Sequence, residues 1–235
     1  EISRVVTDSL SDYLFAPSDD AVENLRAEGY SDDQIHLAGN VMVDTLLANL
    51  ERARARPTLA DLGVTAGEYG LVTLHRPSNV DDEATLAGLV AGLGRIAAQL
   101  ELVFPVHPRT RERLGRLAVP DGIRLVEPQG YLDFLALQAG ARLVITDSGC
   151  VQEETTMLGV PCLTARESTE RPITVTHGSN VVVGTDPDRI VAAALDVLGG
   201  PPRTYPTPSL WDGQAAERIA DVIATGPPTR RPTDR

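Results

Sequence analysis

The sequence predicts an α/β protein with a parallel sheet and helices on both faces. Runs rich in Val, Ile and Leu alternate with amphipathic segments of helical period between residues 69 and 198. Runs as apolar as 102–106 and 142–146 fit strands that are covered on both sides, as in a parallel sheet. Polar residues follow several of these runs directly, at the sheet edge where ligands of such folds bind.

Composition narrows the class of partner. The chain has 235 residues, of which 42% are hydrophobic, and a formal net charge of −12. This charge argues against binding to nucleic acid or to an anionic membrane, so neither partner is expected. Lysine is absent, so a charge clamp for an anion must use Arg or His, and a Schiff-base or P-loop lysine is excluded. No apolar run approaches the roughly 18 residues that span a bilayer.

Cysteine usage indicates a reducing compartment. Cys150 and Cys162 are the two cysteines of the chain, too few for a disulfide scaffold. No Cys and His spacing is typical of zinc. We therefore expect a cytoplasmic protein without a bound metal.

Residues 1–50 are expected to be the end of a first Rossmann-like α/β domain. Their order is helix 1–10, strand 13–17, helix 21–28, strand 34–38 and helix 41–50. Ser18 and the two residues after it resemble a helix cap, and Gly29 ends that helix. The Arg-rich residues 51–68 are expected to connect two domains.

Residues 69–208 are expected to form a second α/β domain that holds the ligand. Its strands are predicted at 69–74, 102–106, 123–126, 142–146, 162–165 and 180–183. Its helices are predicted at 81–100, 110–117, 134–139, 151–158 and 187–198. A last helix within 209–225 is expected to pack back on the first domain, and the tail 226–235 is expected to be disordered.

Several polar groups follow predicted strands and are expected to meet at the carboxyl edge of the sheet. They are His75 and Arg76, His107 and Arg109, Ser148 and Gly149, and Arg171. Each has a purely structural alternative: a histidine that holds its loop, a serine that caps a helix, or arginines in surface ion pairs. Convergence of four such groups on one edge favours a ligand site.

The turn at Ser148 and Gly149 suits a phosphate, because it presents the free N–H groups and positive dipole of a helix start. Glu153 and Glu154 lie one turn further on, where a carboxylate can accept hydrogen bonds from ribose hydroxyls. These residues could also simply favour the start of the helix.

Four runs resemble the non-hydrolysing UDP-N-acetylglucosamine 2-epimerases. They are VTLHRPSN (72–79), FPVHPRT (104–110), TDSGCVQEE (146–154) and GVPCLTARESTERP (159–172). The resemblance implies a glycosyltransferase-B type fold, in which two Rossmann-like domains close on a nucleotide sugar. It also implies that the second domain is complete here and the first is partial, with roughly a hundred residues of the first domain not represented.

The resemblance implies interconversion of UDP-GlcNAc and UDP-ManNAc without a cofactor, by anti elimination and re-addition of UDP. It assigns catalytic positions to His75 and Glu1, with the remaining acid/base carboxylates in the part not represented, so the chain alone is expected to be inactive. It further implies a homodimer, whose interface no stretch of the sequence identifies. The UDP ligands implied are Phe134 beside uracil, Ser148 and Gly149 at the phosphates, Glu154 at the ribose, and Arg171. A second UDP-GlcNAc, bound as an activator, would contact Arg76 and His107.

Three departures from the family pattern stand out. Cys150 replaces a glycine beside the phosphate turn, which would weaken UDP binding if the position needed a positive φ. A helix start could also lower the pKa of its thiol. Ser3 replaces an asparagine, and Pro77-Ser78 replaces Arg-Glu. Two other functions remain open: a UDP-sugar glycosyltransferase or hydrolysing epimerase of the same fold, and a non-catalytic UDP-binding fragment.

Overall fold

The computed structural model describes residues 2–226, except for the side chain of Arg109. The chain divides into two compact units: residues 48–207 form unit 2, and the residues before and after that range form unit 1. No helix in the described part of the chain is both long and apolar enough to cross a membrane.

Unit 1 is a small α/β layer. Its elements are α1 (Ile2–Leu10), β1 (Leu14–Ala16), α2 (Asp19–Ala27), β2 (Ile35–Leu37), the start of α3 (Val41–Arg54) and α12 (Ala215–Ala224). Strands β1 and β2 pair in parallel. Leu14 and Ile35 from these strands pack with Val22 and Leu25 of α2 in a small core.

Within unit 1, the C-terminal segment is attached to the N-terminal one by polar contacts. The carboxylate of Asp44 accepts hydrogen bonds from the N–H groups of Ala215 (3.2 Å) and Ala216 (2.7 Å), which are otherwise unpaired at the start of α12. The buried indole of Trp211 donates to the carbonyl of Pro17 at 2.9 Å.

Unit 2 contains a six-stranded sheet in which every pairing is parallel, as the sequence predicts. The strands are β3 (Tyr69–Thr73), β4 (Glu101–Pro105), β5 (Ile123–Val126), β6 (Leu143–Thr146), β7 (Cys162–Thr164) and β8 (Asn180–Val182). Their order is β5-β4-β3-β6-β7-β8, so the chain builds outward from β3 on one side and then from β6 on the other. The boundary between β3 and β6 is the topological switch point, where ligands of such sheets bind.

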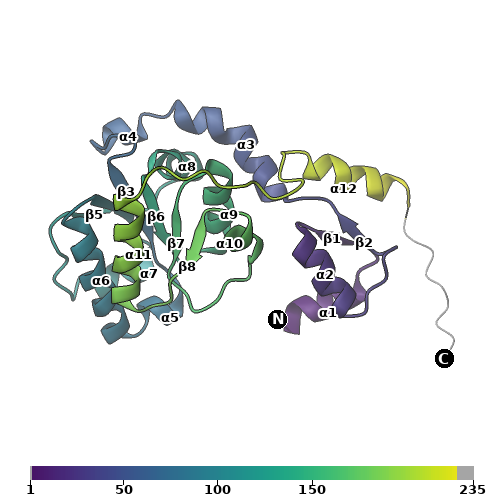
Figure 1. The fold of residues 1–235 in the computed structure, drawn as a ribbon, viewed down its shortest axis with the longest axis horizontal. Coiled ribbons are helices and arrows are strands. Elements are labelled where there is room, and N and C mark those ends of the chain that lie inside the picture. Colours follow the sequence, from purple (N-terminus) through teal and green to yellow (C-terminus); the bar gives the residue numbers. More distant parts are fainter. Residues whose placement is uncertain (1, 227–235) are drawn as a thin grey trace. The chain divides into compact units, whose positions relative to one another are not determined.

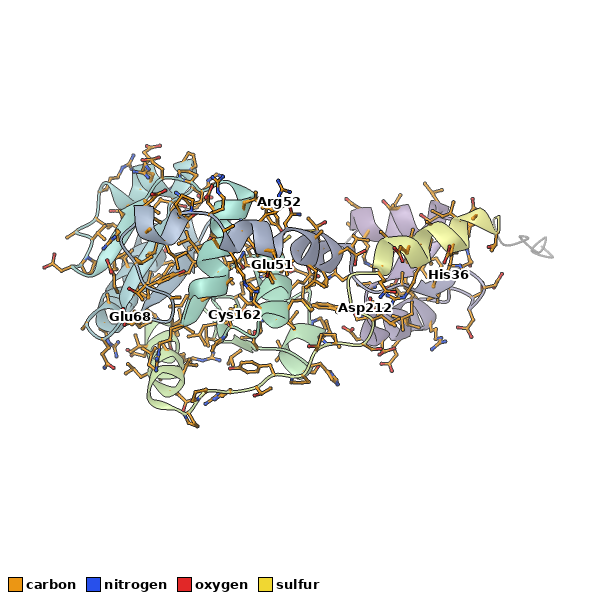
Figure 2. The ribbon with its side chains drawn as sticks, turned by 90° about the horizontal axis from the view of Figure 1, so that it is seen from above. His36, Glu51, Arg52, Glu68, Cys162 and Asp212 are labelled. Atoms are coloured by element: carbon orange, nitrogen blue, oxygen red, sulfur yellow. The ribbon has the colours of Figure 1, made fainter. Side chains whose placement is uncertain are left out.

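Helices cover both faces of this sheet (Figure 1). One face carries α6 (Glu83–Ala97), α7 (Pro108–Leu114) and α11 (Pro187–Gly199), and the other carries α4 (Thr58–Asp61), α8 (Tyr131–Gly140) and α9 (Gly149–Leu158). Successive strand residues supply the two cores: Val72 packs toward α6, whereas Leu71 packs toward α8 and α9. Cys162 on β7, labelled in Figure 2, belongs to the second core and is fully buried.

Three short helices were not expected from the sequence: α4, α5 (Pro77–Val80) and α10 (Ile173–Thr176). Each has four residues, too few to show a helical period. Residues 51–68, expected as a connection, are grouped with unit 2. Leu59 and Leu62 pack against its second core, and Arg56 binds the carboxylate of Asp133 at 2.9 Å, which holds this segment on α8.

Candidate active site

Asp147 joins the two loops at the switch point of the sheet. It directly follows β6, and its side chain has no exposed surface. Its carboxylate accepts hydrogen bonds from the backbone N–H groups of His75 (3.0 Å) and Arg76 (2.9 Å) and from the side-chain amide of Asn79 (3.0 Å). The loop after β3 is thereby fixed against the turn after β6.

The imidazole of His75 pairs with the same carboxylate. Its Nδ1 lies 2.8 Å from Oδ1 of Asp147, and 43% of the His75 side chain is exposed. The hydrogen bond to Asp147 raises the pKa of His75, and this effect outweighs partial burial and the charge of Arg76. Burial alone would raise the pKa of Asp147, but the hydrogen bonds from His75 and from the Arg76 backbone hold it below its usual value.

Two further basic groups surround His75. His107 follows β4 and is exposed, with its ring centroid 6.4 Å from that of His75. The Nε of Arg76 donates to the carbonyl of Asp147 at 3.1 Å, and its Nη1 lies 3.6 Å from Glu170. This corner of the sheet therefore gathers two imidazoles and a guanidinium around one buried carboxylate, and an anion would be attracted there.

The turn between β6 and α9 is open. Ser148 precedes the first helical residue, and among the described residues its hydroxyl makes no capping hydrogen bond to the helix. The Ser148 N–H donates to the hydroxyl of Thr146 at 3.0 Å. A Cβ placed on Gly149 would meet no described atom within 4 Å. Because the first N–H groups of a helix lack partners within it, this open turn can hold a phosphate.

Cys150 does not strain this turn. Leu210 is the single non-glycine residue with positive φ in the described chain, so Cys150 has ordinary helical geometry and the cost considered from the sequence does not arise. The thiol is exposed. Its pKa is raised, first by partial burial and then by the charges of Glu153 and Glu154, which favours a tolerated small residue over a reactive thiol at this position.

The two glutamates of α9 are buried and have different partners. Oε1 of Glu153 lies 2.7 Å from Nε of Arg171, whose side chain is 41% exposed. Oε2 of Glu154 accepts a hydrogen bond from the Gln138 amide at 2.6 Å. Burial raises the pKa of Glu154, while hydrogen bonds from Gln138 and Tyr131 act in the opposite direction.

The loop after β7 is attached to α9. The guanidinium of Arg166 makes two hydrogen bonds of 2.6 Å to the carboxylate of Glu170, which lowers the pKa of Glu170 to about 2. The hydroxyl of Thr169 donates to Gln152 of α9 at 2.6 Å and accepts from the backbone N–H of Arg171 at 3.0 Å. These bonds position Arg171 next to the helix that begins at the open turn.

The structure therefore places the residues expected from the sequence as follows. His75 and Arg76 are hydrogen-bonded to Asp147, which Ser148 and Gly149 follow directly in the chain, and His107 lies beside His75. Arg171 and Glu154 lie along α9, and Phe134 is half-buried against the second core. Glu1 lies outside the described residues.

Asp147, Asn79 and Gln138 were not recognised as site residues from the sequence. The available signal for Asp147 is an acidic residue that directly follows a buried strand. Its partners lie 68 to 72 residues away in the chain, so the sequence contains no local sign of them.

Known proteins resemble this chain over most of its length. Residues 1–224 match the UDP-N-acetylglucosamine 2-epimerase family. The UDP-N-acetylglucosamine 2-epimerase of Methanocaldococcus jannaschii is 38% identical over 96% of this chain and 64% of its own length. The UDP-2,3-diacetamido-2,3-dideoxy-D-glucuronate 2-epimerase of Pseudomonas aeruginosa is also 38% identical, over 95% of this chain and 63% of its own length.

A crystal structure of the M. jannaschii enzyme in complex with UDP-GlcNAc and UDP superposes with a TM-score of 0.86 over 96% of this chain and 64% of that one. The chain thus spans just under two thirds of the length of these relatives. A match over nearly all of its residues, with the same fold, shows that the chain belongs to the UDP-N-acetylglucosamine 2-epimerase family.

Proposed function

We propose that unit 2 binds the uridine diphosphate of a nucleotide sugar and that the chain acts in the 2-epimerisation of UDP-GlcNAc to UDP-ManNAc. One observation carries the proposal. Asp147 holds His75 and Arg76 beside the open turn at Ser148 and Gly149, so that two basic side chains adjoin a helix start suited to phosphate. The ribose hydroxyls would bind Glu154, uracil would lie beside Phe134, and Arg171 would approach the diphosphate.

The chemistry requires that UDP leave C1 while a proton leaves C2, and that both return. Charge develops on the departing phosphate, and preorganised donors stabilise such charge strongly in a site that excludes water. His75 and the N–H groups at the start of α9 are suited to this role. The family resemblance assigns the carboxylates that exchange the C2 proton to Glu1 and to a part of the relatives that this chain does not span.

We therefore expect the 235 residues alone to bind UDP without turnover. Calorimetric titration should show UDP binding more tightly than UMP, and uridine more weakly than UMP, because the diphosphate supplies most of the charge contacts. Equal affinity for uridine and UDP would contradict the proposed phosphate site. Measurable epimerisation by these residues alone would overturn the expectation that they are inactive.

Glu154 allows a separate test of the ribose contact. Glu154→Gln removes an acceptor for ribose hydroxyls and should weaken UDP binding several-fold while narrowing the difference between UDP and its 2′-deoxy form. Glu101→Gln is the matched control, because Glu101 pairs with Arg124 and lies at the start of β4, away from the carboxyl edge of the sheet. Unchanged discrimination in Glu154→Gln would exclude this carboxylate as the ribose ligand.

A protein that supplies the complete family architecture around this chain should incorporate deuterium at C2 when it converts UDP-GlcNAc in D2O. Conversion without that exchange would refute the elimination mechanism. Release of free UDP together with transfer of the sugar to an acceptor or to water would instead identify a glycosyltransferase or a hydrolysing epimerase.

The relatives leave a second candidate substrate. The P. aeruginosa protein is as similar to this chain as the M. jannaschii enzyme is, and its name specifies a diacetamido uronate sugar. Both names describe 2-epimerisation of a UDP-linked 2-acetamido sugar. Competition between the two UDP-sugars for binding and turnover would decide between them.

Finer features of the family are also proposals here. Arg76 and His107 are proposed to contact a second UDP-GlcNAc that acts as an activator, and the active protein is proposed to be a cytoplasmic homodimer of two-domain subunits. Its product is proposed to feed polysaccharide biosynthesis. A sigmoidal dependence of rate on UDP-GlcNAc that becomes hyperbolic in His107→Ala would support the activator site, and a hyperbolic rate in the wild type would contradict it.

A further inference from the structure

The carboxylate of Asp147 uses both of its oxygens as acceptors. Oδ1 faces Nδ1 of His75 at 2.8 Å, and Oδ2 accepts from the backbone of Arg76 and from the amide of Asn79 at 2.9 and 3.0 Å. Asn79 is itself fully buried, and its amide also donates to the carbonyl of Ala165 at 2.9 Å. The carboxylate is therefore fixed in one orientation by donors from the loop after β3.

A fixed acceptor at Nδ1 determines which imidazole nitrogen carries the proton. An ionised carboxylate cannot donate, so Nδ1 of His75 must hold its hydrogen, and Nε2 remains as the nitrogen that gains or loses a proton. Nδ1 is the ring nitrogen that faces the carboxylate, and nearly half of the His75 side chain is exposed, so Nε2 is the nitrogen available to a ligand.

We propose that Asp147 is a positioning residue that holds His75 in the Nδ1–H form, so that Nε2 exchanges a proton with the leaving diphosphate. The proton exchange between Nε2 and the diphosphate rests on the proposed function, whereas the tautomer of His75 does not. Before elimination the ring carries protons on both nitrogens. The C1–O bond then breaks with its electron pair on the phosphate oxygen, Nε2 gives its proton to that oxygen, and His75 is left neutral with its proton on Nδ1. Re-addition of UDP to C1 returns the proton to Nε2.

Other charged groups near His75 do not determine its tautomer. Arg76, on the same loop, opposes protonation of the ring through its charge. His107 belongs to the loop after β4, and its ring centroid lies 6.4 Å from that of His75. At this separation the nitrogens of the two rings are too far apart for a direct hydrogen bond. Asp147 is the group whose hydrogen bond raises the pKa of His75.

The substitution Asp147→Asn tests the proposal sharply, because an amide must place its NH2 group where one carboxylate oxygen stood. Toward Oδ2 it would face three donors: the backbone N–H groups of His75 and Arg76 and the amide of Asn79. Toward Oδ1 it would face the imidazole and the longer contact of 3.2 Å from the His75 N–H, so the NH2 group should turn toward His75 and donate to Nδ1. His75 would then be held neutral with its proton on Nε2. The variant should therefore invert the tautomer and lower the pKa of His75 by about 1 unit or more, the size of effect expected for loss of a neighbouring carboxylate.

Histidine-labelled protein and long-range ¹H–¹⁵N spectra over a pH series read out the tautomer and the pKa of each ring. In the wild-type chain, neutral His75 should carry its proton on Nδ1, and its pKa should lie above the ordinary histidine value of about 6.5. A neutral wild-type His75 protonated on Nε2 would overturn the proposal, and this result needs no variant to fold. An unchanged pKa and tautomer in folded Asp147→Asn would overturn it as well.

Asp133→Asn is the matched control, because Asp133 also accepts from several donors in unit 2 but contacts no histidine. It should leave the His75 signals unchanged. Addition of UDP to the wild-type chain tests the proton exchange with the diphosphate. The ¹⁵N signal of Nε2 should shift, and the signal of Nδ1 should change much less. Failure of UDP to bind would contradict the proposed function and leave the tautomer result standing, whereas UDP binding without a shift of Nε2 would exclude contact between His75 and the diphosphate.

Discussion

The Nε atom of Arg171 lies 2.7 Å from Oε1 of Glu153, a carboxylate whose side chain is only 6% exposed. The guanidinium belongs to the loop after β7, and the carboxylate belongs to the second turn of α9. This ion pair holds a positive charge beside the helix that begins at the proposed phosphate turn. It also leaves more than a third of the Arg171 side chain accessible to a ligand.

Arg171→Ala should weaken UDP binding by about tenfold or more, since one charge-assisted hydrogen bond contributes roughly 1.5–3 kcal/mol. It should also lower the free energy of unfolding by on the order of 1 kcal/mol, because the exposed arginine limits what the pair contributes. Calorimetry and urea unfolding measure the two effects. Arg203→Ala is the control, since Arg203 is 43% exposed and pairs with Asp196 at 2.7 Å. An equal loss of UDP affinity in both variants would exclude a specific role for Arg171.

Gly149→Ala separates binding from folding. The backbone at Gly149 is helical and the space around its Cβ is open, so the variant should unfold within about 0.5 kcal/mol of the wild type or be slightly more stable. The added methyl group would occupy the proposed phosphate position, and UDP affinity should fall by about tenfold. Gly178→Ala should instead lower the free energy of unfolding by about 1–3 kcal/mol. Its Cβ would collide with the Thr174 carbonyl and the Thr156 side chain. Full UDP affinity in Gly149→Ala would place the diphosphate elsewhere.

Cys150 should alkylate slowly despite its exposure, because burial and the neighbouring glutamates raise its pKa and leave little thiolate at neutral pH. Its rate with iodoacetamide should be below that of a free cysteine at pH 7 and should still be rising above pH 9. Peptide mass spectrometry distinguishes it from Cys162, which is buried and should react only after unfolding. Rapid modification of Cys150 at neutral pH would contradict the electrostatics described for this turn.

The pair of His75 and Asp147 should make stability depend on pH in a defined direction. A histidine with a raised pKa stabilises the fold fully below its unfolded value of about 6.5, and this contribution disappears as pH rises through the folded pKa. The carboxylate stays ionised throughout this window, since its own pKa is lowered. The difference in unfolding free energy between wild type and His75→Gln should therefore be larger at pH 6 than at pH 9.

The size of that change should stay below about 1 kcal/mol, because the ring is nearly half exposed and water screens the pair. Urea unfolding at the two pH values measures it. His177→Gln serves as the control, since His177 is exposed and contacts Thr176 rather than a carboxylate. A difference that grows from pH 6 to pH 9 would show that the ring is stabilised in its neutral form.

The strands of unit 2 could be predicted from the sequence because burial on both faces leaves continuous apolar runs, as at Leu143–Thr146. Their alternation with helices predicts the parallel sheet, which is confirmed. The sequence does not show which strands are neighbours. Strand β3 lies beside β6, and Thr73 pairs with Thr146 although 72 residues lie between them in the chain. This pairing follows only from the folded chain.

The polar partners of the site were harder to predict. The sequence singles out His75 and Ser148 as candidates, because each follows a strand and has a characteristic chemistry. Asp147 was not, because its role depends on donors that approach from the loop after β3. Gln138 likewise lies on α8, a helix of mostly apolar sequence. Its amide meets Glu154 only in the folded chain.

Trp211 is an intrinsic fluorescence probe for unit 1. It is the single tryptophan of the chain, and its buried indole is anchored to Pro17 inside unit 1. Intrinsic fluorescence on heating should therefore follow the melting of unit 1. Circular dichroism, which samples helices throughout, would be needed beside it, and two separate midpoints from the two methods would reveal whether the units melt independently.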